Sequence, residues 1–509
     1  MERELKLRIA PGDLDKLRHT PFLAHGQAEA NSPHLLTSTY FDTPELAIHR
    51  CKASLRVRAD GQQRTQTLKL EGVGDAGVFD RDEFEMPVDR DTPDLALLSD
   101  AISADTECGK LIRDQAVVSQ IAPVFVTRIN RTVIVLRLPP EDEIEVALDE
   151  GTVDSQARSV PLAGVELELK RGNPQALHAA ALELLKVAPL RIDHRSKADV
   201  GYELLVAEHA EAVKAEPVCL GKSDSIEDAF CTIAHNCLAQ VHANERGVVS
   251  GHDPSCVHQM RVGLRRLRSA LDLFDKMIPA YSGLDDELRW IAAELGAARD
   301  WEVLAGATLD RAGADGNAGE MESVRQACTQ MAVDNRKRAA AAAESVRYTR
   351  LVLELTLWLD AKKWRDAMTD KQLAAIDRPA RQFAAAVLSG RHGKLIKRGK
   401  RLAELDDHRR HRARIAAKKV RYATEFFASL SSKHAVQHYI KALTALQDDL
   451  GWRNDAVVAD QLLRTVSKKS SAAVPGAAFA RGYLASRVAA DQQTLKKLWK
   501  RFRRLSPPH

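Results

Sequence analysis

The 509-residue sequence has few aromatic residues, few cysteines and no long apolar run. Phe, Trp and Tyr make up only 5% of it, and its seven cysteines include no CxxC pair, which argues against a disulfide framework or a thiolate zinc site. The most apolar stretch, 351–359, falls well short of the roughly 20 residues that a membrane-spanning helix needs. Charged residues at the amino terminus stand where a signal peptide has its apolar core. We therefore expect a cytoplasmic protein without a membrane partner, and the length predicts two or three domains.

A formal net charge of +5 conceals two parts of opposite charge. Residues 1–210 contain 25 Lys and Arg against 35 Asp and Glu, whereas the remainder contains 50 against 35. All six tryptophans also lie in the second part. This division predicts two modules with different electrostatic roles, of which the basic one binds an anionic partner.

Short stretches that alternate polar and apolar residues dominate the first 170 residues, a pattern that predicts strands. We expect about eight strands in an antiparallel barrel, followed by a helix over 174–187 that begins at a proline. The predicted strands are residues 2–9, 35–41, 54–59, 65–71, 78–86, 131–138, 143–148 and 165–170.

The polar faces of these strands carry charges of both signs, and two arrangements fit them. An ordinary barrel has an apolar interior and a charged surface in water. An inverted barrel packs its apolar faces under helices and lines a tunnel with its charges. Carboxylates in such a tunnel would hold divalent cations, and Arg and Lys would bind phosphate oxygens. Periodicity alone leaves both arrangements open.

A series of short motifs favours the inverted barrel. It opens with Glu2-x-Glu4-x-Lys6 and continues in order along the chain. The later members are TYFDTP (39–44), SLRVR (54–58), QTLK (66–69), RDE (81–83), FVT (125–127) with Arg131, EVALDEG (145–151), ELELK (166–170) and SKA (196–198) with Gly201-Tyr202. The ordered series resembles the CYTH domain, also called the triphosphate tunnel metalloenzyme family, over residues 1–205.

The resemblance implies an eight-stranded antiparallel tunnel that binds a triphosphate and a divalent cation, Mg²⁺ or Mn²⁺. The residues that it implies for the metal are Glu2, Glu4, Glu145, Glu166 and Glu168. Those that it implies for the phosphates are Lys6, Arg56, Arg58, Lys69, Arg81, Arg131 and Lys197, of which Lys6, Arg56, Arg58 and Lys69 also form the catalytic set. Members of the family act on inorganic triphosphate, thiamine triphosphate, RNA or ATP. The scarcity of aromatic residues favours a substrate without a ring.

A linker over 206–224 precedes a helical second module over 225–505. Ser225 and Asp228 have the spacing of a capping box, and apolar residues then recur three and four positions apart. The fold class is thus multidomain, with an N-terminal α+β module built on an eight-stranded antiparallel tunnel and a C-terminal all-α module.

The second module contains an internal repeat. Residues 257–274 align without a gap on 410–427, so that histidine and basic residues recur at the same positions. The repeat predicts two helical bundles related by an approximate twofold axis. Residues 391–421 include thirteen Lys and Arg but only three acids, a strip that suits a long linear polyanion.

The paired motifs resemble the CHAD domain, a conserved-histidine α-helical domain that binds inorganic polyphosphate. By that resemblance the polyphosphate contacts are His258, Arg261, Arg265, Arg268, His411, Arg414, Lys418 and Arg421.

Together the two resemblances predict a metal-dependent triphosphatase that converts inorganic triphosphate (tripolyphosphate) to pyrophosphate and phosphate. They also predict that the protein binds inorganic polyphosphate. Polyphosphate granules are therefore a further expected location. Two alternatives stay open: a non-catalytic polyphosphate-binding or granule-targeting protein, and a CYTH enzyme acting on an organic triphosphate. Binding of nucleic acid through Trp452 and Trp499 is the weakest hypothesis.

Overall fold

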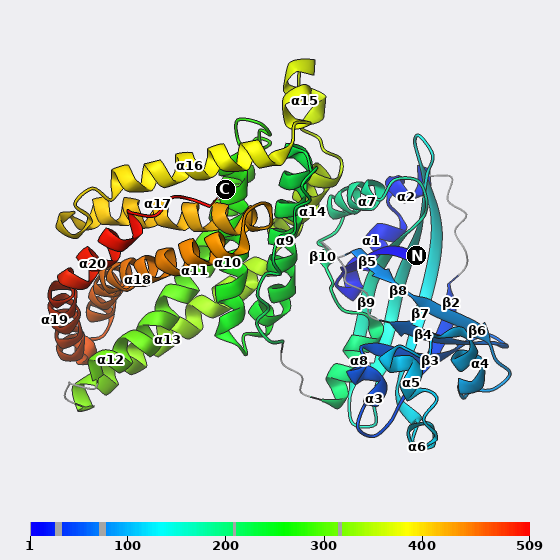
Figure 1. The fold of residues 1–509 in the computed structure, drawn as a ribbon. Coiled ribbons are helices and arrows are strands. Elements are labelled where there is room, and N and C mark those ends of the chain that lie inside the picture. Colours follow the sequence, from blue (N-terminus) through cyan, green and yellow to red (C-terminus); the bar gives the residue numbers. More distant parts are fainter. Residues whose placement is uncertain (1, 26–32, 71–77, 207–209, 314–317, 509) are drawn as a thin grey trace. The chain divides into compact units, whose positions relative to one another are not determined.

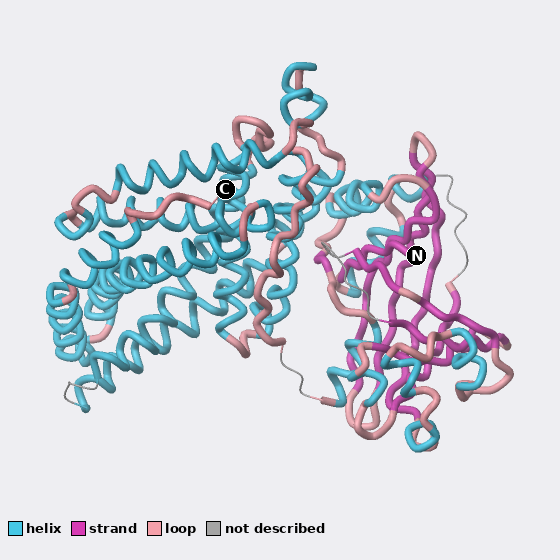
Figure 2. The backbone as a smooth tube through the Cα atoms, in the orientation of Figure 1, coloured by secondary structure: helices cyan, strands magenta, loops and turns pink. Residues whose placement is uncertain are grey.

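The computed structural model describes residues 2–25, 33–70, 78–206, 210–313 and 318–508. The chain forms two units (Figure 1). The first unit comprises residues 1–209 with 344–361, and the second comprises 210–343 with 362–509. Among the described residues, all ten named strands belong to the first unit, and the second unit is helical (Figure 2).

The first unit is built on an antiparallel sheet in the order β10-β1-β9-β8-β7-β2-β3-β4-β6, with β5 paired to β1. The strands are β1 Glu2–Arg8, β2 His34–Asp42, β3 Ala53–Asp60, β4 Gln63–Leu70, β5 Val78–Arg81, β6 Glu83–Pro87, β7 Ala122–Leu138, β8 Asp142–Asp154, β9 Ser159–Arg171 and β10 Arg191–Ile192. Its helices up to residue 205 are α1 Leu14–Arg18, α2 Pro21–His25, α3 Ala47–Arg50, α4 Leu95–Ala101, α5 Glu107–Leu111, α6 Gln115–Val118, α7 Gln175–Leu185 and α8 Lys197–Leu205.

The stretch 78–86, predicted as one strand, is divided in two at Asp82. The segment before the break, β5, pairs with β1, whereas β6 pairs with β4 at the far end of the strand order. The chain therefore connects the two sides of the sheet through this break, which gives the sheet its tunnel-like form.

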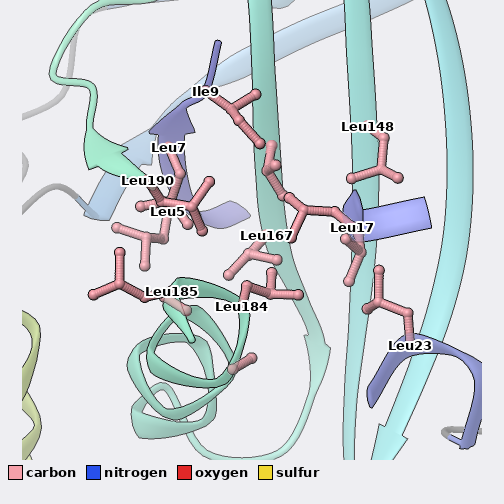
Figure 3. Packing of buried hydrophobic residues seen from close by; sticks show 14 of the residues in the cluster. Leu5, Leu7, Ile9, Leu17, Leu23, Leu148, Leu167, Leu184, Leu185 and Leu190 are labelled. Atoms are coloured by element: carbon pink, nitrogen blue, oxygen red, sulfur yellow. The ribbon is translucent and has the colours of Figure 1, made fainter. Parts of the chain in front are cut away.

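The apolar faces of the strands pack beneath helices. Leu5 and Leu7 of β1 and Leu167 of β9 are at most 1% exposed and lie in one cluster with Leu184 and Leu185 of α7. Figure 3 shows these leucines gathered between the helix and the strands. Each fully buried leucine contributes about 1.5–3 kcal/mol to folding. The inverted barrel is thus confirmed, because the opposite faces of the same strands are left for the charged residues.

Helix α14 (Val346–Asp360) belongs to the first unit, although it lies within the 225–505 stretch that the sequence predicts as one module. It packs against α7, and Leu353 is fully buried in the leucine cluster. Gln175 Nε2 donates a hydrogen bond to the carbonyl of Asp360 at 2.7 Å, and Arg8 forms an ion pair with Glu344 at 2.9 Å. The helix therefore completes the core of the unit that carries the sheet.

The second unit consists of helices that pack in pairs. Its helices are α9 Ile226–Ser250, α10 Pro254–Phe274, α11 Leu284–Val303, α12 Leu309–Gly313, α13 Ala318–Ala343, α15 Asp370–Ile376, α16 Ala380–Arg398, α17 Asp407–Phe426, α18 Lys433–Lys469, α19 Val474–Ala490 and α20 Gln492–Phe502. The predicted capping box is confirmed: the Ser225 side chain accepts from the Asp228 amide, and the Asp228 carboxylate accepts from the Ser225 amide. Helices α10 and α17, which carry the two repeat motifs, are in contact with each other. The twofold relation between two bundles stays a prediction.

No helix among the described residues combines the length and the apolar character that crossing a bilayer requires.

Candidate functional site

A cavity of about 680 Å³ lies among the strands of the first unit and the start of α8. The predicted residues that line it are Glu4, Lys6, Arg56, Arg58, Lys69, Arg131, Glu145, Glu166, Glu168 and Lys197. Glu2 and Arg81 face each other across β1 and β5, but their side chains lie outside the described residues. Alternation along each strand places these charged residues on the face opposite the leucine core.

Three carboxylates form a row across neighbouring strands. The strand register sets Glu4 of β1 opposite Glu168 of β9, and Glu168 opposite Glu145 of β8. Like charges directly opposite each other destabilise a sheet, so the row requires a cation. Lys6 Nζ lies 2.9 Å from Glu4, and Lys170 Nζ lies 2.6 Å from Glu168 and 3.5 Å from Glu145. Lysines therefore compensate these carboxylates in this structure.

Glu166 is the centre of a denser network beside this row. Its carboxylate accepts hydrogen bonds from Lys6 at 3.0 Å, from Lys197 at 2.5 Å and from Arg131. Arg131 also donates to both oxygens of the buried Asp149, at 2.7 and 2.6 Å. Burial alone would raise the pKa of Glu166, but Lys197, Lys6 and Arg131 outweigh it and hold that pKa well below its ordinary value. Glu166 is thus ionised and fixed in place.

The part of the lining from β3 to β6 mixes the cations Arg56, Arg58 and Lys69 with the carboxylates Asp82, Glu83 and Glu85. The charge of Arg56, together with burial, lowers the pKa of Arg58 to about 10. Burial and Arg56 also lower the pKa of Lys69, although Lys69 Nζ lies 2.8 Å from Glu83. A cation whose pKa is lowered by a neighbouring cation gains free energy when an anion binds beside both. Arg58 and Lys69, next to Arg56, are therefore suited to binding phosphate oxygens.

The carboxylate row fits a hard divalent cation in its chemistry, because Mg²⁺ and Mn²⁺ prefer oxygen ligands. Of the five residues predicted for the metal, Glu4, Glu145 and Glu168 are the ones that would hold it, because Glu166 is bonded to three cations and the side chain of Glu2 lies outside the described residues. Their oxygens do not all come within 4.8 Å of one another among the described residues, and Lys6 and Lys170 bind them instead.

Several residues of this cavity were not assigned from the sequence. Lys170 follows Glu168 by two positions in ELELK, so alternation could have placed it on the tunnel face. Asp149 lies two residues before Gly151 and could be interpreted as a turn residue, whereas it is a buried partner of Arg131 and Lys197. Glu83 shares the RDE motif with Arg81, but its ion pair with Lys69 depends on the pairing of β6 with β4, which the sequence does not show.

A second cavity, of about 980 Å³, lies in the second unit among α10, α11, α17 and α18. Both copies of the repeat motif contribute to it. The predicted residues that line it are His258, Arg261, Arg265, Arg268, His411, Arg414 and Lys418. Arg421 is not among them, because it forms an ion pair with Glu425 at 2.7 Å on its own helix.

Positive charge is incompletely neutralised in this second cavity. Burial together with Arg265 and Arg414 lowers the pKa of Lys418 to about 7. Burial and the nearby arginines lower the pKa of His258 to about 4, so this imidazole is neutral at neutral pH. The Nε atoms of Arg265 and Arg414 are buried and lack a hydrogen-bond partner within the described part of the chain. The cavity therefore offers unused donors as well as charge.

Aspartates moderate this charge at corresponding positions of the two repeats. In the first repeat, Asp300 lies 3.2 Å from Arg261. In the second repeat, Asp455 lies near Arg414; burial raises the pKa of Asp455, and the charge of Arg414 opposes this rise. The sequence shows the recurrence of the two aspartates, 155 residues apart, but not their place beside the motif arginines.

Comparison with known proteins finds both domain families in this chain. Residues 1–202 match the CYTH domain and residues 232–464 match the CHAD domain. An inorganic triphosphatase of Haemophilus influenzae is 31% identical over 204 residues, which are 40% of this chain and 54% of that protein, so the match spans about half of its length.

Two solved structures were also found to be similar. The CHAD domain of Ricinus communis has 36% identity and a TM-score of 0.53, and the match covers 59% of this chain and 99% of that chain. A Hippeastrum protein, described as a candidate adenylyl cyclase with dominant triphosphatase activity, has 18% identity and a TM-score of 0.29 over 40% of this chain and 96% of its own. By the two family models, the chain contains a CYTH domain followed by a CHAD domain.

Proposed function

We propose that the first unit hydrolyses inorganic triphosphate to pyrophosphate and phosphate with the help of a divalent cation. The observation that carries this proposal is one cavity whose lining contains both the row of carboxylates and the cations Arg56, Arg58 and Lys69. The similarity to an inorganic triphosphatase supports the same reaction, over about half of that protein's length.

The chain's own residues bind and orient the substrate. Arg56, Arg58 and Lys69 bind the phosphate oxygens, and the arginines can do so with two parallel hydrogen bonds. Arg131 and Lys197, held by Asp149 and Glu166, present further positive charge from fixed positions. Phosphoryl transfer depends mainly on such positioning and on stabilisation of charge in the transition state.

Glu4, Glu145 and Glu168 hold the metal in this proposal. When bound, Mg²⁺ or Mn²⁺ offsets phosphoryl charge and lowers the pKa of a water molecule. Lys6 and Lys170, which bond to these carboxylates in the structure, keep the row compensated without it.

The aromatic residues favour an inorganic substrate over an organic one. Tyr40 lines the cavity but is only 2% exposed, and its ring stacks on Phe125 at a centroid distance of 4.5 Å. Phe41 and Phe84 belong to a hydrophobic cluster under the sheet. Among the described residues, no aromatic face is therefore left in the cavity for a nucleobase or a thiamine ring.

For the second unit we propose binding of inorganic polyphosphate. Support comes from seven motif residues around one cavity, from the depressed pKa of Lys418 and from the unpartnered Nε atoms of Arg265 and Arg414. Polyphosphate supplies a row of anionic oxygens that matches such donors.

The test of the hydrolytic activity is phosphate release from tripolyphosphate with Mg²⁺ and with Mn²⁺. Replacing one charge-stabilising donor, Lys69→Gln, is expected to lower kcat about 10²–10³-fold. Lys186→Gln is the control, because Lys186 is exposed at the carboxyl end of α7, where it pairs with Glu183 and does not line the cavity. Wild-type turnover by Lys69→Gln would exclude the proposed site. Tight polyphosphate binding without phosphate release under either ion would instead favour a non-catalytic binding protein.

A further inference from the structure

The basic region of the second unit extends beyond the cavity that the repeat motifs line. A separate cavity of about 510 Å³ lies at the connection between α16 and α17. We call its basic lining residues the outer groove: they are Lys394, Lys397, Arg398, Lys400, Arg409 and Arg412. All six are exposed, and Leu405 is the remaining residue of the lining.

A third, smaller cavity of about 230 Å³ joins the outer groove to the motif cavity. It shares Asp272 and Lys419 with the motif cavity. With the outer groove it shares Lys394 and Arg398. The three cavities therefore follow one another and share parts of their walls, and we call this series, from the repeat motifs to the carboxyl end of α16, the path.

The cations of the outer groove are almost without acidic partners. Arg409 lies 3.5 Å from Asp406, but within the described part of the chain the other five form no ion pair within 4 Å. Exposed Lys and Arg side chains usually point singly into water. Six of these side chains line the outer groove, and its lining includes no carboxylate. The resulting positive potential attracts an anion.

The junction between the cavities has a different charge pattern. Asp272 is the single carboxylate of the joining cavity, and it lies 2.6 Å from Arg391 and 3.0 Å from Lys419. These ion pairs hold a cation on each of α16 and α17 at the junction. Basic residues thus continue through the junction, where Asp272 is the one carboxylate of the lining.

We propose that the path binds one polyphosphate chain along its length, with part of the chain in the motif cavity and its continuation in the outer groove. The proposal rests on the proposed binding of polyphosphate by the second unit. A chain long enough to reach both cavities gains from two linked contacts, whereas a short chain fills only one. The path therefore makes the domain selective for long chains.

The lining of the joining cavity and of the outer groove favours polyphosphate over a single-stranded nucleic acid. Proteins that bind single strands without sequence preference combine a basic groove with aromatic side chains that stack on bases. No aromatic residue lines the joining cavity or the outer groove, as far as the chain is described.

The test uses the full chain with Lys394→Gln, Arg398→Gln and Arg409→Gln combined. Labelled long-chain polyphosphate is the probe, and unlabelled long and short chains compete for it. We expect the wild type to prefer long chains, and we expect the triple variant to bind the long chain about tenfold or more weakly and to lose the preference. The slope of log K against log salt concentration should fall by roughly two, because each phosphate that a basic side chain neutralises adds roughly 0.7 to it.

A matched control separates the path from net charge. Arg464→Gln, Lys468→Gln and Lys469→Gln remove the same charge from exposed positions of α18 that line none of the three cavities. The inference would be overturned if the control variant bound the long chain as weakly as the first triple variant does. It would also be overturned if the first triple variant kept the preference for long chains. Either result would leave polyphosphate binding by the motif cavity intact. A wild type that binds no polyphosphate of any length would overturn both. Stronger displacement by RNA than by polyphosphate would assign the path to nucleic acid.

Discussion

Lys418 shows how neighbouring charges alter a single residue. It lies on α17 among Arg265 and Arg261 of α10 and Arg414 of its own helix, with Asp455 of α18 as the opposing charge. Burial and the three arginines lower its pKa to about 7, from an ordinary value of 10.5. A lysine in this state gains or loses its charge close to neutral pH, which an isolated lysine does not.

The titration of Lys418 predicts that polyphosphate binding depends on pH. A bound polyanion raises the pKa of Lys418, so binding takes up a proton and affinity should fall as the pH rises from about 6 to 8. Binding titrations across this range measure the effect. Lys418→Met should flatten the dependence by removing the group, whereas Lys418→Arg should hold the affinity at the upper end, because arginine stays charged. A slope that persists in both variants would assign the dependence to another group.

Helix α14 is the element whose position the sequence least suggests. Its chain neighbours on both sides belong to the second unit, yet its Leu353 lies in the leucine cluster of the first unit with Leu5 and Leu184. The helix covers apolar surface that α7 alone would leave open. The main part of the first unit ends at residue 209, and α14 follows about 140 residues later in the chain. The stability of the tunnel fold thus depends on this distant segment.

Leu353→Ala tests this dependence. Truncation of a buried leucine leaves a cavity and should lower the free energy of unfolding of the first unit by about 2–5 kcal/mol. Amide hydrogen exchange in β1 and β9 should become faster, because their leucines pack in the same cluster. Arg350→Ala is the control on an exposed position of the same helix. Unchanged exchange in both strands would show that α14 does not stabilise the sheet.

At the scale of the whole molecule, each unit holds its own anion site. Every residue that lines the tunnel cavity belongs to the first unit, and every residue that lines the motif cavity belongs to the second. The net charge of +5 is therefore the sum of two unlike parts, an N-terminal part with a cavity rich in carboxylates and a basic helical part.

This separation predicts that the two functions can be removed independently. Arg261→Glu combined with Arg414→Glu should abolish polyphosphate binding and leave the rate of tripolyphosphate hydrolysis unchanged, as measured by phosphate release. The reversed charges would stand beside Asp300 and Asp455 and repel phosphate. Arg464→Glu with Arg487→Glu is the control of equal charge on exposed positions. Loss of hydrolysis in the first variant would show that the sites depend on each other.

The sequence by itself separated the charged and the apolar residues of each strand onto two faces, because alternation along a strand fixes the face of each side chain. It also determined the start of the helical module at Ser225, because a capping box is a local interaction. The alignment of 257–274 on 410–427 likewise predicted two matching sets of cations.

Only the tertiary structure decided which of these residues meet. It divided 78–86 at Asp82 between two partner strands, placed Lys170 against Glu168, moved α14 to the first unit and left Arg421 outside the motif cavity. It also joined that cavity to the outer groove through Asp272. Most of these outcomes depend on residues distant in the chain, whose pairing follows from the packing of whole strands and helices. Local spacing carries no information about such pairing.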